Sequence, residues 1–165
     1  MKSNETARHV KVADETWIAT ALLHREFPDR EDFTIGEIVK RASVQKLHGE
    51  LRPGVRVHAA MHCVANREPN PGRYRMLLAT GNNRRRLYRT ADPTHPLRKG
   101  KITPRREDIP KRYHVLLEWY EKTYARIGNG SGRRDPILAL RGYGKEIWGG
   151  ENPDAYVRRM REGWE

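Results

Sequence analysis

The stretch FTIGEI at residues 33–38 decides how the first half of this chain folds. The Thr34 hydroxyl can accept a hydrogen bond from the backbone of Glu37, and the Glu37 carboxylate can accept one from the backbone of Thr34, which is a capping box. Phe33, directly before the cap, can pack on Ile38 as a hydrophobic staple. The pattern predicts a helix that begins here and continues through the segment FTIGEIVKRASVQK.

Apolar side chains recur at helical spacing on both sides of this segment. The stretch DETWIATALLHREF (14–27) predicts a helix with Asp14 as its N-cap, and the stretch GVRVHAAMHCVAN (54–66) predicts another. The buried face of the helix at 54–66 is expected to consist of Val57, Ala60, Met61 and Val64. Three helices therefore form the first part of the chain.

A hairpin is expected after the third helix. Two short β-like runs, at 73–78 and 84–88, flank the turn residues Thr80-Gly81-Asn82-Asn83. Glycine and asparagine are frequent in the tight turns that join antiparallel strands.

The next segments differ in character. Residues 92–108 hold three prolines and five lysines or arginines with little periodicity, which predicts an extended basic connector. Residues 109–127 carry apolar side chains at steps of three and four, which predicts a fourth helix with Pro110 in its first turn. This helix could cover the core of the preceding domain or pair with its copy in a second chain.

The expected fold class is mainly α with a small β-hairpin. Three helices followed by a hairpin is the element order of a winged helix-turn-helix, in which the third helix lies in the DNA major groove and the hairpin lies beside it. The expected segments are a winged-helix DNA-binding domain (12–91), a basic connector (92–108), a packing or dimerisation helix (109–127), a flexible linker (128–135) and a helical C-terminal tail (136–165).

The positive charge is concentrated in one part of the chain. The 165 residues carry 33 Lys and Arg against 21 Asp and Glu, a formal net charge of +12. Residues 71–112 hold 13 basic and 3 acidic side chains, a net +10, whereas 1–70 and 113–165 each carry a net +1. A block of one sign indicates a polyanion as partner, most often a nucleic acid, and a solvated basic loop is the plainer alternative.

Phosphate binding needs several cations along the duplex, and base reading needs donors and acceptors on the helix that enters the groove. Arg56 and Asn66 are the favoured base readers. The candidate DNA-binding residues are Arg52, Arg56, His58, His62, Asn66, Arg67, Arg73, Arg84, Arg85, Arg86 and Arg89.

Composition also narrows the cellular setting. No apolar run approaches the roughly 20 residues that a membrane-spanning helix needs, and no apolar signal core occurs near residue 1, so neither feature is expected. The single cysteine, Cys63, excludes an internal disulfide and indicates a reducing, cytoplasmic compartment.

The last part of the chain carries a motif of its own. The stretch LALRGYGKEIW (138–148) is followed by DAYVRRMREGW (154–164). Together they resemble the toxin-binding tail of VapB-type antitoxins, which often reads L-x-G-x-G-K-x-[IL]-W and then D-x-Y-[VI]-R-x-[LM]-R-x-x-W. The tryptophans, the paired glycines and the Tyr-Val-Arg-Arg run fall at the spacing of that family.

This resemblance implies a PIN-domain ribonuclease toxin as partner, with a carboxylate cluster that holds Mg²⁺ or Mn²⁺. Such a tail wraps the toxin and can place a basic side chain among those carboxylates. The candidates for that side chain are Arg141, Lys145, Arg158, Arg159 and Arg161. The residues expected to bind the toxin are Leu138, Arg141, Tyr143, Lys145, Ile147, Trp148, Tyr156, Arg159, Met160 and Trp164. From the residues alone, an amphipathic tail with tryptophans suits docking into a groove of another protein. Packing on its own chain or on a second copy is the alternative.

Two enzymatic interpretations are weaker. His58 and His62 stand at a spacing that can bind zinc, but Ala59 replaces the glutamate of the metalloprotease motif and no third ligand is evident. The carboxylates of residues 26–32 lie in a turn with two arginines, which favours a solvated loop over a nuclease site. We therefore expect a non-enzymatic protein without cofactor or metal.

The expected function is that of an antitoxin and operon repressor. Its expected partners are double-stranded operator DNA, a PIN-domain toxin and a second copy of itself, because operators are commonly palindromic. A stand-alone winged-helix regulator of a defence or restriction locus, with a structural C-terminus, is the alternative.

Overall fold

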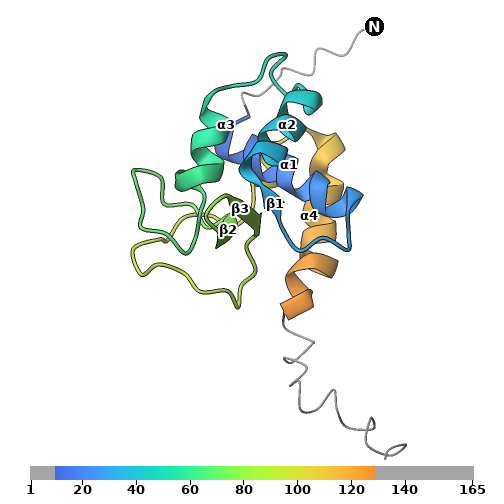
Figure 1. Ribbon diagram of the computed structural model, residues 1–165. Coiled ribbons are helices and arrows are strands. Elements are labelled where there is room, and N and C mark those ends of the chain that lie inside the picture. Colours follow the sequence, from blue (N-terminus) through green and yellow to red (C-terminus); the bar gives the residue numbers. More distant parts are fainter. Residues whose placement is uncertain (1–9, 129–165) are drawn as a thin grey trace, which may run out of the picture. The chain divides into compact units, whose positions relative to one another are not determined.

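The computed structural model describes residues 10–128, which belong to one compact unit (Figure 1). The predicted tail at 136–165 lies outside the described residues, as does all but the first position of the predicted linker at 128–135. In the described part of the chain, every helix is too short or too polar to cross a bilayer.

The fold is mainly helical, as expected. Its α-helices are α1 (Val12–Glu26), α2 (Ile35–Gln45), α3 (Gly54–Val57) and α4 (His114–Trp119). α3 continues directly into a π-helical turn, His58–His62. α4 is preceded by the 3₁₀ turn Lys111–Tyr113 and followed by the π turn Tyr120–Tyr124 and the 3₁₀ turn Ala125–Gly128. The predicted fourth helix is therefore confirmed as a helical segment that changes its winding three times.

A small antiparallel sheet lies beside the helices. β2 (Leu77–Gly81) and β3 (Arg84–Leu87) form a hairpin, as predicted, and β1 (Phe33–Thr34) adds a third strand in the order β1-β3-β2. The predicted bounds of the first strand, 73–78, are wrong, because β2 begins at Leu77 and includes Thr80 and Gly81 of the expected turn. β1 has only two residues, which is too short to give a pattern in the sequence. It ties the start of α2 to the hairpin, because Phe33 lies opposite Arg85.

The predicted capping box forms at the start of α2. The Glu37 backbone N–H donates to the Thr34 hydroxyl (3.1 Å), and the Thr34 backbone N–H donates to the Glu37 carboxylate (2.8 Å). Phe33 and Ile38 are both fully buried in the same core cluster, as expected of the staple. Arg30 adds a two-pronged contact to the Glu37 carboxylate, at 2.7 and 3.1 Å.

Glu37 makes the stability of the fold depend on pH in the acid range. Hydrogen bonds from Arg30 and Thr34 lower the pKa of Glu37 from 4.5 to about 2. Because the folded-state pKa is depressed, this stabilisation is complete above pH 4.5 and is lost as the pH falls towards 2. We expect Glu37→Gln to flatten the decline of unfolding free energy over this window, measured by urea denaturation at several pH values. Glu50→Gln, an exposed carboxyl elsewhere, is the control, and an equal acid dependence in Glu37→Gln and the wild type would contradict the account.

The predicted role of Asp14 is wrong. The N-cap of α1 is Lys11, three residues earlier, and the Asp14 carboxylate is completely buried. Its partner is the Lys101 ammonium, 2.6 Å away, in the segment that was expected to be an extended connector. Burial raises the pKa of Asp14, although Lys101 opposes that shift. The long-range ion pair therefore fixes α1 to residues far along the chain.

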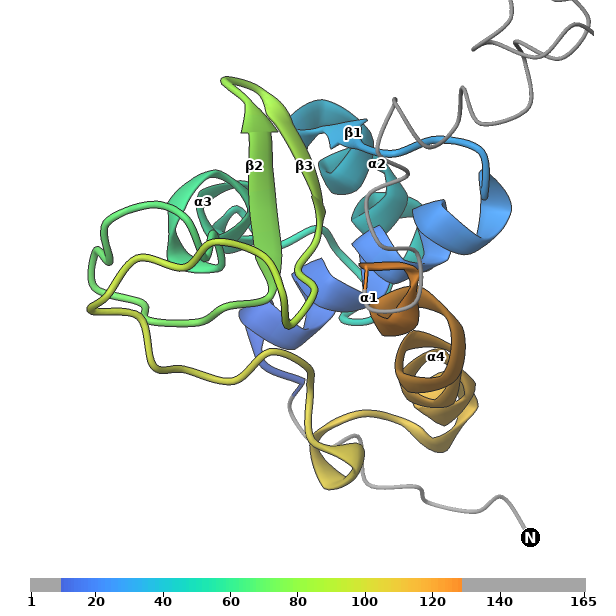
Figure 2. The ribbon, with the colours of Figure 1, turned by 90° about the horizontal axis from the view of Figure 1, so that it is seen from below.

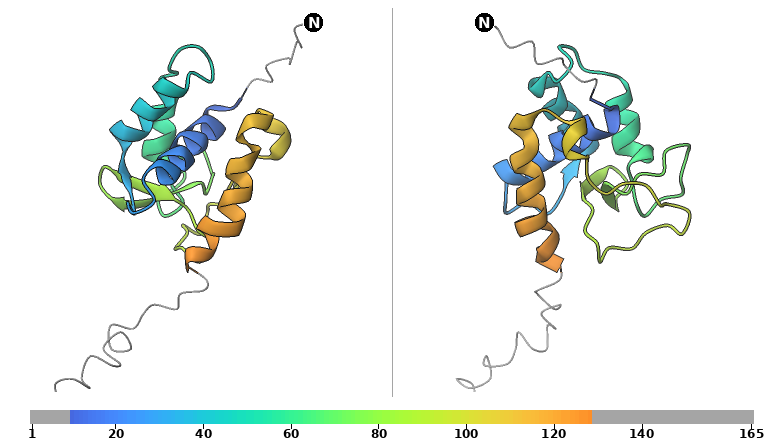
Figure 3. Two further views of the ribbon diagram at one scale, coloured as in Figure 1. Left: turned by 90° about the vertical axis from the view of Figure 1, so that its right-hand side faces the viewer. Right: turned by 180° about the vertical axis from the view of Figure 1, so that it is seen from behind.

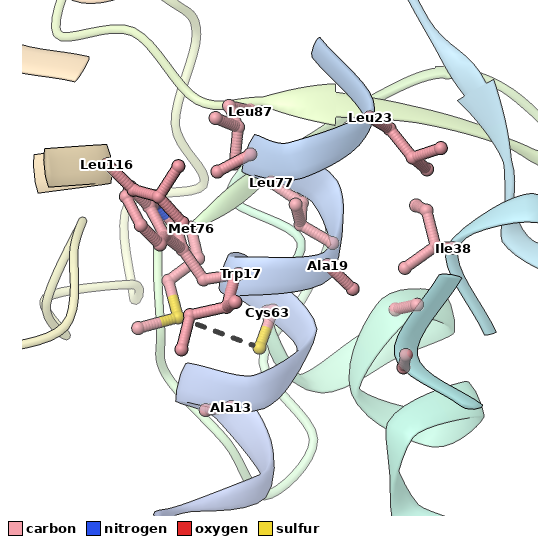
Figure 4. Packing of buried hydrophobic residues seen from close by; sticks show 14 of the residues in the cluster. Ala13, Trp17, Ala19, Leu23, Ile38, Cys63, Met76, Leu77, Leu87 and Leu116 are labelled. Atoms are coloured by element: carbon pink, nitrogen blue, oxygen red, sulfur yellow. Dashed lines mark hydrogen bonds between the residues drawn. The ribbon is translucent and has the colours of Figure 1, made fainter. Parts of the chain in front are cut away.

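α1 passes through the centre of the unit, with most of its residues buried (Figure 2). The Trp17 indole packs edge-on against Tyr120, with ring centroids 5.8 Å apart. Around Trp17 the core gathers Met76, Leu116 and the free thiol of Cys63 (Figure 4). The helical segment around α4 thus packs on the core of its own chain. α3 and α4 lie on opposite sides of α1 (Figures 1 and 3).

Candidate nucleic-acid interface

α3 and its π turn form one continuous helical segment, Gly54–His62. Its solvent-exposed side, here called the outer face of α3, differs from the predicted one. Val55, Ala59 and Cys63 are buried, whereas Val57 and Met61 are 40% and 41% exposed, so their predicted burial is wrong. The helix also ends at His62 rather than at residue 66. In the π turn the Cys63 N–H bonds to the His58 carbonyl (3.0 Å) across five residues. This wider turn shifts the phase of the helix, which a regular 3.6-residue period cannot anticipate.

Two buried arginines hold the C-terminal end of α3 and its π turn. The last carbonyls of a helix lack backbone partners and form the negative end of its dipole, which a cation can stabilise. Arg85, 1% exposed, donates to the carbonyls of Ala59 (3.0 Å) and Ala60 (3.2 Å). Arg98, 2% exposed, donates to the next two carbonyls, of Met61 (2.7 Å) and His62 (2.9 Å). Burial lowers the pKa of Arg85 to about 10, so its guanidinium stays charged at neutral pH.

Arg98 also organises the loop after α3. It donates to the carbonyls of Arg67 (2.6 Å), Glu68 (3.1 Å) and Tyr74 (2.8 Å). Beside it the Gly100 N–H donates to the Arg73 carbonyl (2.8 Å), and a Cβ at Gly100 would lie 2.5 Å from that oxygen. Only glycine fits this approach. Residues 98–101, predicted to be an extended connector, thus clamp the loop that follows α3.

The hairpin arginines occupy structural positions. Arg86 is 7% exposed, and its guanidinium forms a two-pronged ion pair with Asp92, at 2.6 and 2.8 Å. Arg84 is exposed, but its guanidinium bonds to Asp32 (2.6 Å). Together with the buried Arg85, these side chains stabilise the fold, and Arg85 and Arg86 are inaccessible to a nucleic acid. This corrects the expectation that they bind DNA.

Three other candidates are also engaged internally. Arg52 donates to the carboxylate of the buried Glu15 (2.5 Å), and the Arg89 guanidinium lies over the ring of Tyr124, 4.5 Å from its centroid. The Asn66 amide donates to the carbonyl of Ala79 (3.0 Å) and accepts from its N–H (2.9 Å). Asn66 thus pairs with β2 as a strand residue would, and its predicted role as a base reader conflicts with this pairing.

Asn66→Ala should therefore act on stability. Losing both hydrogen bonds leaves the Ala79 backbone without those partners, and we expect a loss of about 1–3 kcal/mol in unfolding free energy by urea denaturation. The affinity of the folded variant for DNA should stay within about twofold of the wild type, because the paired Asn66 makes no base contact. Loss of a base contact would instead cost roughly 1–3 kcal/mol of binding free energy. Unchanged stability with a large loss of affinity would restore Asn66 to the interface.

Three arginines remain available. Arg56, Arg67 and Arg73 are exposed, and within residues 10–128 their side chains have no hydrogen-bond or ion-pair partner. We call them the α3 arginines, because Arg56 lies on α3 and the other two lie on the loop that Arg98 clamps. Arg67 and Met61 line one hollow of about 530 Å³.

His58 and His62, the first and last residues of the π turn, are half-buried and lie edge to face, with ring centroids 4.9 Å apart. Burial lowers the pKa of His58 to about 4, so His58 is neutral at physiological pH and cannot serve as a phosphate-binding cation. Its Nδ1 lies 3.5 Å from the Cys63 sulfur. Across the described part of the chain, no group of three or more His, Cys, Asp or Glu side chains is placed to hold a metal ion.

Two carboxylates of the acidic turn bind arginines instead of converging. Glu26 pairs with Arg41 (2.6 Å), and Asp32 pairs with Arg84 (2.5 Å) and accepts a hydrogen bond from Thr80 (2.7 Å). The Arg84 and Thr80 contacts lower the pKa of Asp32. This turn thus anchors α2 and the hairpin.

Comparisons with protein-family models, with curated proteins and with solved structures find no match to this chain. The function is therefore inferred from the residues and their arrangement alone.

Proposed function

We propose that residues 10–128 form a winged helix-turn-helix domain that binds double-stranded DNA, with α3 in the major groove. The element order supports this proposal: helix, short strand, helix, helix and hairpin, with the sheet order β1-β3-β2. The α4 segment covers the side of α1 opposite α3 (Figure 1), and Val57 and Met61 on the outer face of α3 are exposed.

The α3 arginines carry the proposal. An exposed arginine without a protein partner keeps its full hydrogen-bonding capacity for a phosphate or a guanine edge. The three lie on a helix and a loop whose backbone is held by Arg85 and Arg98. Because this backbone is already held in the free protein, binding DNA would lose less conformational entropy than binding through an unstructured loop.

In this proposal the β2–β3 hairpin is the wing, and the partners of its arginines determine which phosphate contacts it can make. Arg85 and Arg86 are buried within the fold and Arg84 is paired with Asp32, so the hairpin offers its backbone rather than a row of free cations. Lys99, exposed next to the Arg73–Gly100 contact, extends the positive surface beyond α3. The α3 arginines and Lys99 together allow about four phosphate contacts.

A salt titration tests DNA binding. The full chain is titrated with duplex DNA from immediately upstream of its own gene, by fluorescence anisotropy at several salt concentrations. Four contacts predict that log K falls with log[salt] with a slope of about −3.6. A flat salt profile, or no binding at low salt, would refute the DNA-binding function.

For the whole chain we propose an antitoxin that represses its own operon as a homodimer and neutralises a PIN-domain ribonuclease. The toxin-binding part of this proposal is supported by the sequence pattern of residues 138–164, which lie outside the described residues. Inhibition would be steric and electrostatic, because a basic side chain among the toxin's metal-binding carboxylates blocks both metal and RNA. No chemistry by this chain is required.

The test uses the PIN-domain protein encoded next to this gene. The purified full chain should inhibit its ribonuclease activity, and the variant Trp148→Ala/Trp164→Ala should lose inhibition while binding DNA as before. Full inhibition by that variant would contradict the tail assignment. A missing PIN-domain neighbour together with intact DNA binding would favour the stand-alone regulator.

A further inference from the structure

The outer face of α3 is more apolar than a surface that reads bases only by hydrogen bonds. Val57 and Met61 stand four residues apart on this face, at 40% and 41% exposure, with the half-buried Ala60 between them. The histidines that were expected there lie against each other and near Tyr74 instead. Between residues 10 and 128, Arg56 is the one charged side chain within the α3 helix and its π turn.

An apolar helix face needs a partner, and the charge around it indicates which kind. The α3 arginines lie at both ends of this face: Arg56 in the first turn, and Arg67 in the loop that shares the Met61 hollow. A cationic rim around an apolar centre complements DNA, whose phosphates border a groove. In that groove thymine presents one apolar group, its C5-methyl.

We propose that Val57 and Met61 recognise thymine C5-methyl groups in the major groove, and thereby determine the base preference of α3. The proposal rests on the proposed DNA-binding function and adds the ligand chemistry of one face. Val57 is short and β-branched, so it presents its methyls at a fixed place. Met61 is long and flexible, and the hollow beside it gives its thioether room to adjust to a neighbouring step.

The thymine methyl can be removed without changing the hydrogen bonds of the base. In duplex DNA from upstream of the gene, every thymine is replaced by uracil, and affinity for the full chain is compared at one salt concentration. Burying a methyl contributes roughly 0.8 kcal/mol, which is about fourfold in affinity, so two contacts predict that the wild type binds uracil DNA about 15-fold more weakly. Replacing thymine by 5-bromouracil, whose bromine occupies the place of the methyl, should restore affinity.

The protein variants locate the effect. Val57→Ala/Met61→Ala should bind thymine DNA and uracil DNA within about twofold of each other, because the apolar contacts are gone. Val115→Ala is the matched control: Val115 is 48% exposed and lies on α4. This control should keep the full discrimination of the wild type.

The outcomes separate the two proposals. Tight, salt-dependent binding that is equal for thymine and uracil DNA in the wild type would overturn methyl recognition and leave DNA binding standing. Loss of self-association in Val57→Ala/Met61→Ala by analytical ultracentrifugation, with unchanged thymine preference, would assign the face to a second copy of the chain and overturn the inference. No binding to any duplex would remove the proposed function itself.

Discussion

Replacing Arg98 with methionine is expected to lower the free energy of unfolding by at least about 3 kcal/mol, because five backbone carbonyls lose a buried donor. Each buried acceptor that stays unpaired costs roughly 1–3 kcal/mol, and water can reach some of them. A domain of this size has a stability of about 5–15 kcal/mol, so the loss is a large part of the total. Urea denaturation followed by circular dichroism measures it.

Two further variants make this result interpretable. Arg98→Lys keeps the charge but presents a compact ammonium, which cannot reach all five carbonyls at once. The loss of unfolding free energy should therefore be at least about half of the loss in Arg98→Met. Arg105→Met removes an exposed arginine of the same segment and should change the unfolding free energy by less than about 0.5 kcal/mol. A loss below about 1 kcal/mol in Arg98→Met would mean that the loop after α3 is held by other contacts.

Removing the α3 arginines together is expected to weaken DNA binding by a factor on the order of 100–1000 at about 0.1 M salt. Each phosphate contact releases counterions and contributes about 0.9 to the slope of log K against log[salt], so Arg56→Gln/Arg67→Gln/Arg73→Gln should reduce that slope by about 2–3. Stability should hardly change, because within residues 10–128 these side chains have no bonded partner. Fluorescence anisotropy over a salt series gives both quantities.

The control removes the same number of charges near α4. Arg105, Lys111 and Arg112 are exposed around the first turns of that segment, on the far side of α1 from α3. Their triple glutamine variant has the same net charge as the α3 variant, so it separates a local contact from the general attraction of a basic protein for DNA. Equal losses in the two triple variants would show that charge alone draws the protein to DNA.

Local patterns in the sequence were sufficient where the interaction itself is local. The capping box joins Thr34 and Glu37, three residues apart, and both partners are visible in one short stretch. The β2–β3 hairpin likewise depends on its own turn at Gly81 to Asn83. For this reason the order of the helices and the hairpin, and the mainly helical class, could be predicted from the residues, whereas β1 could not.

The roles of the arginines could not be predicted, because they depend on distant backbone groups. Arg85 and Arg98 look like surface cations in a basic segment, yet each reaches carbonyls more than 20 residues away. Arginine is rarely buried, so burial is never the default expectation for it. Asn66 pairs with Ala79 for the same reason, through a contact that exists only after the hairpin has docked. The role of Arg98 in holding the loop after α3 was missed, because the sequence gave no signal beyond its position before a lysine and a glycine.

The central claim is that the outer face of α3 lies against DNA, and site-specific photo-crosslinking tests it most directly. A photoreactive amino acid replaces either Val57 on α3 or Val115 on α4, both exposed apolar positions. The full chain is then irradiated with duplex DNA from upstream of its gene. The account predicts a DNA adduct from position 57 that competing unlabelled duplex abolishes, and no adduct from position 115. Crosslinking from position 115 with none from position 57 would contradict it.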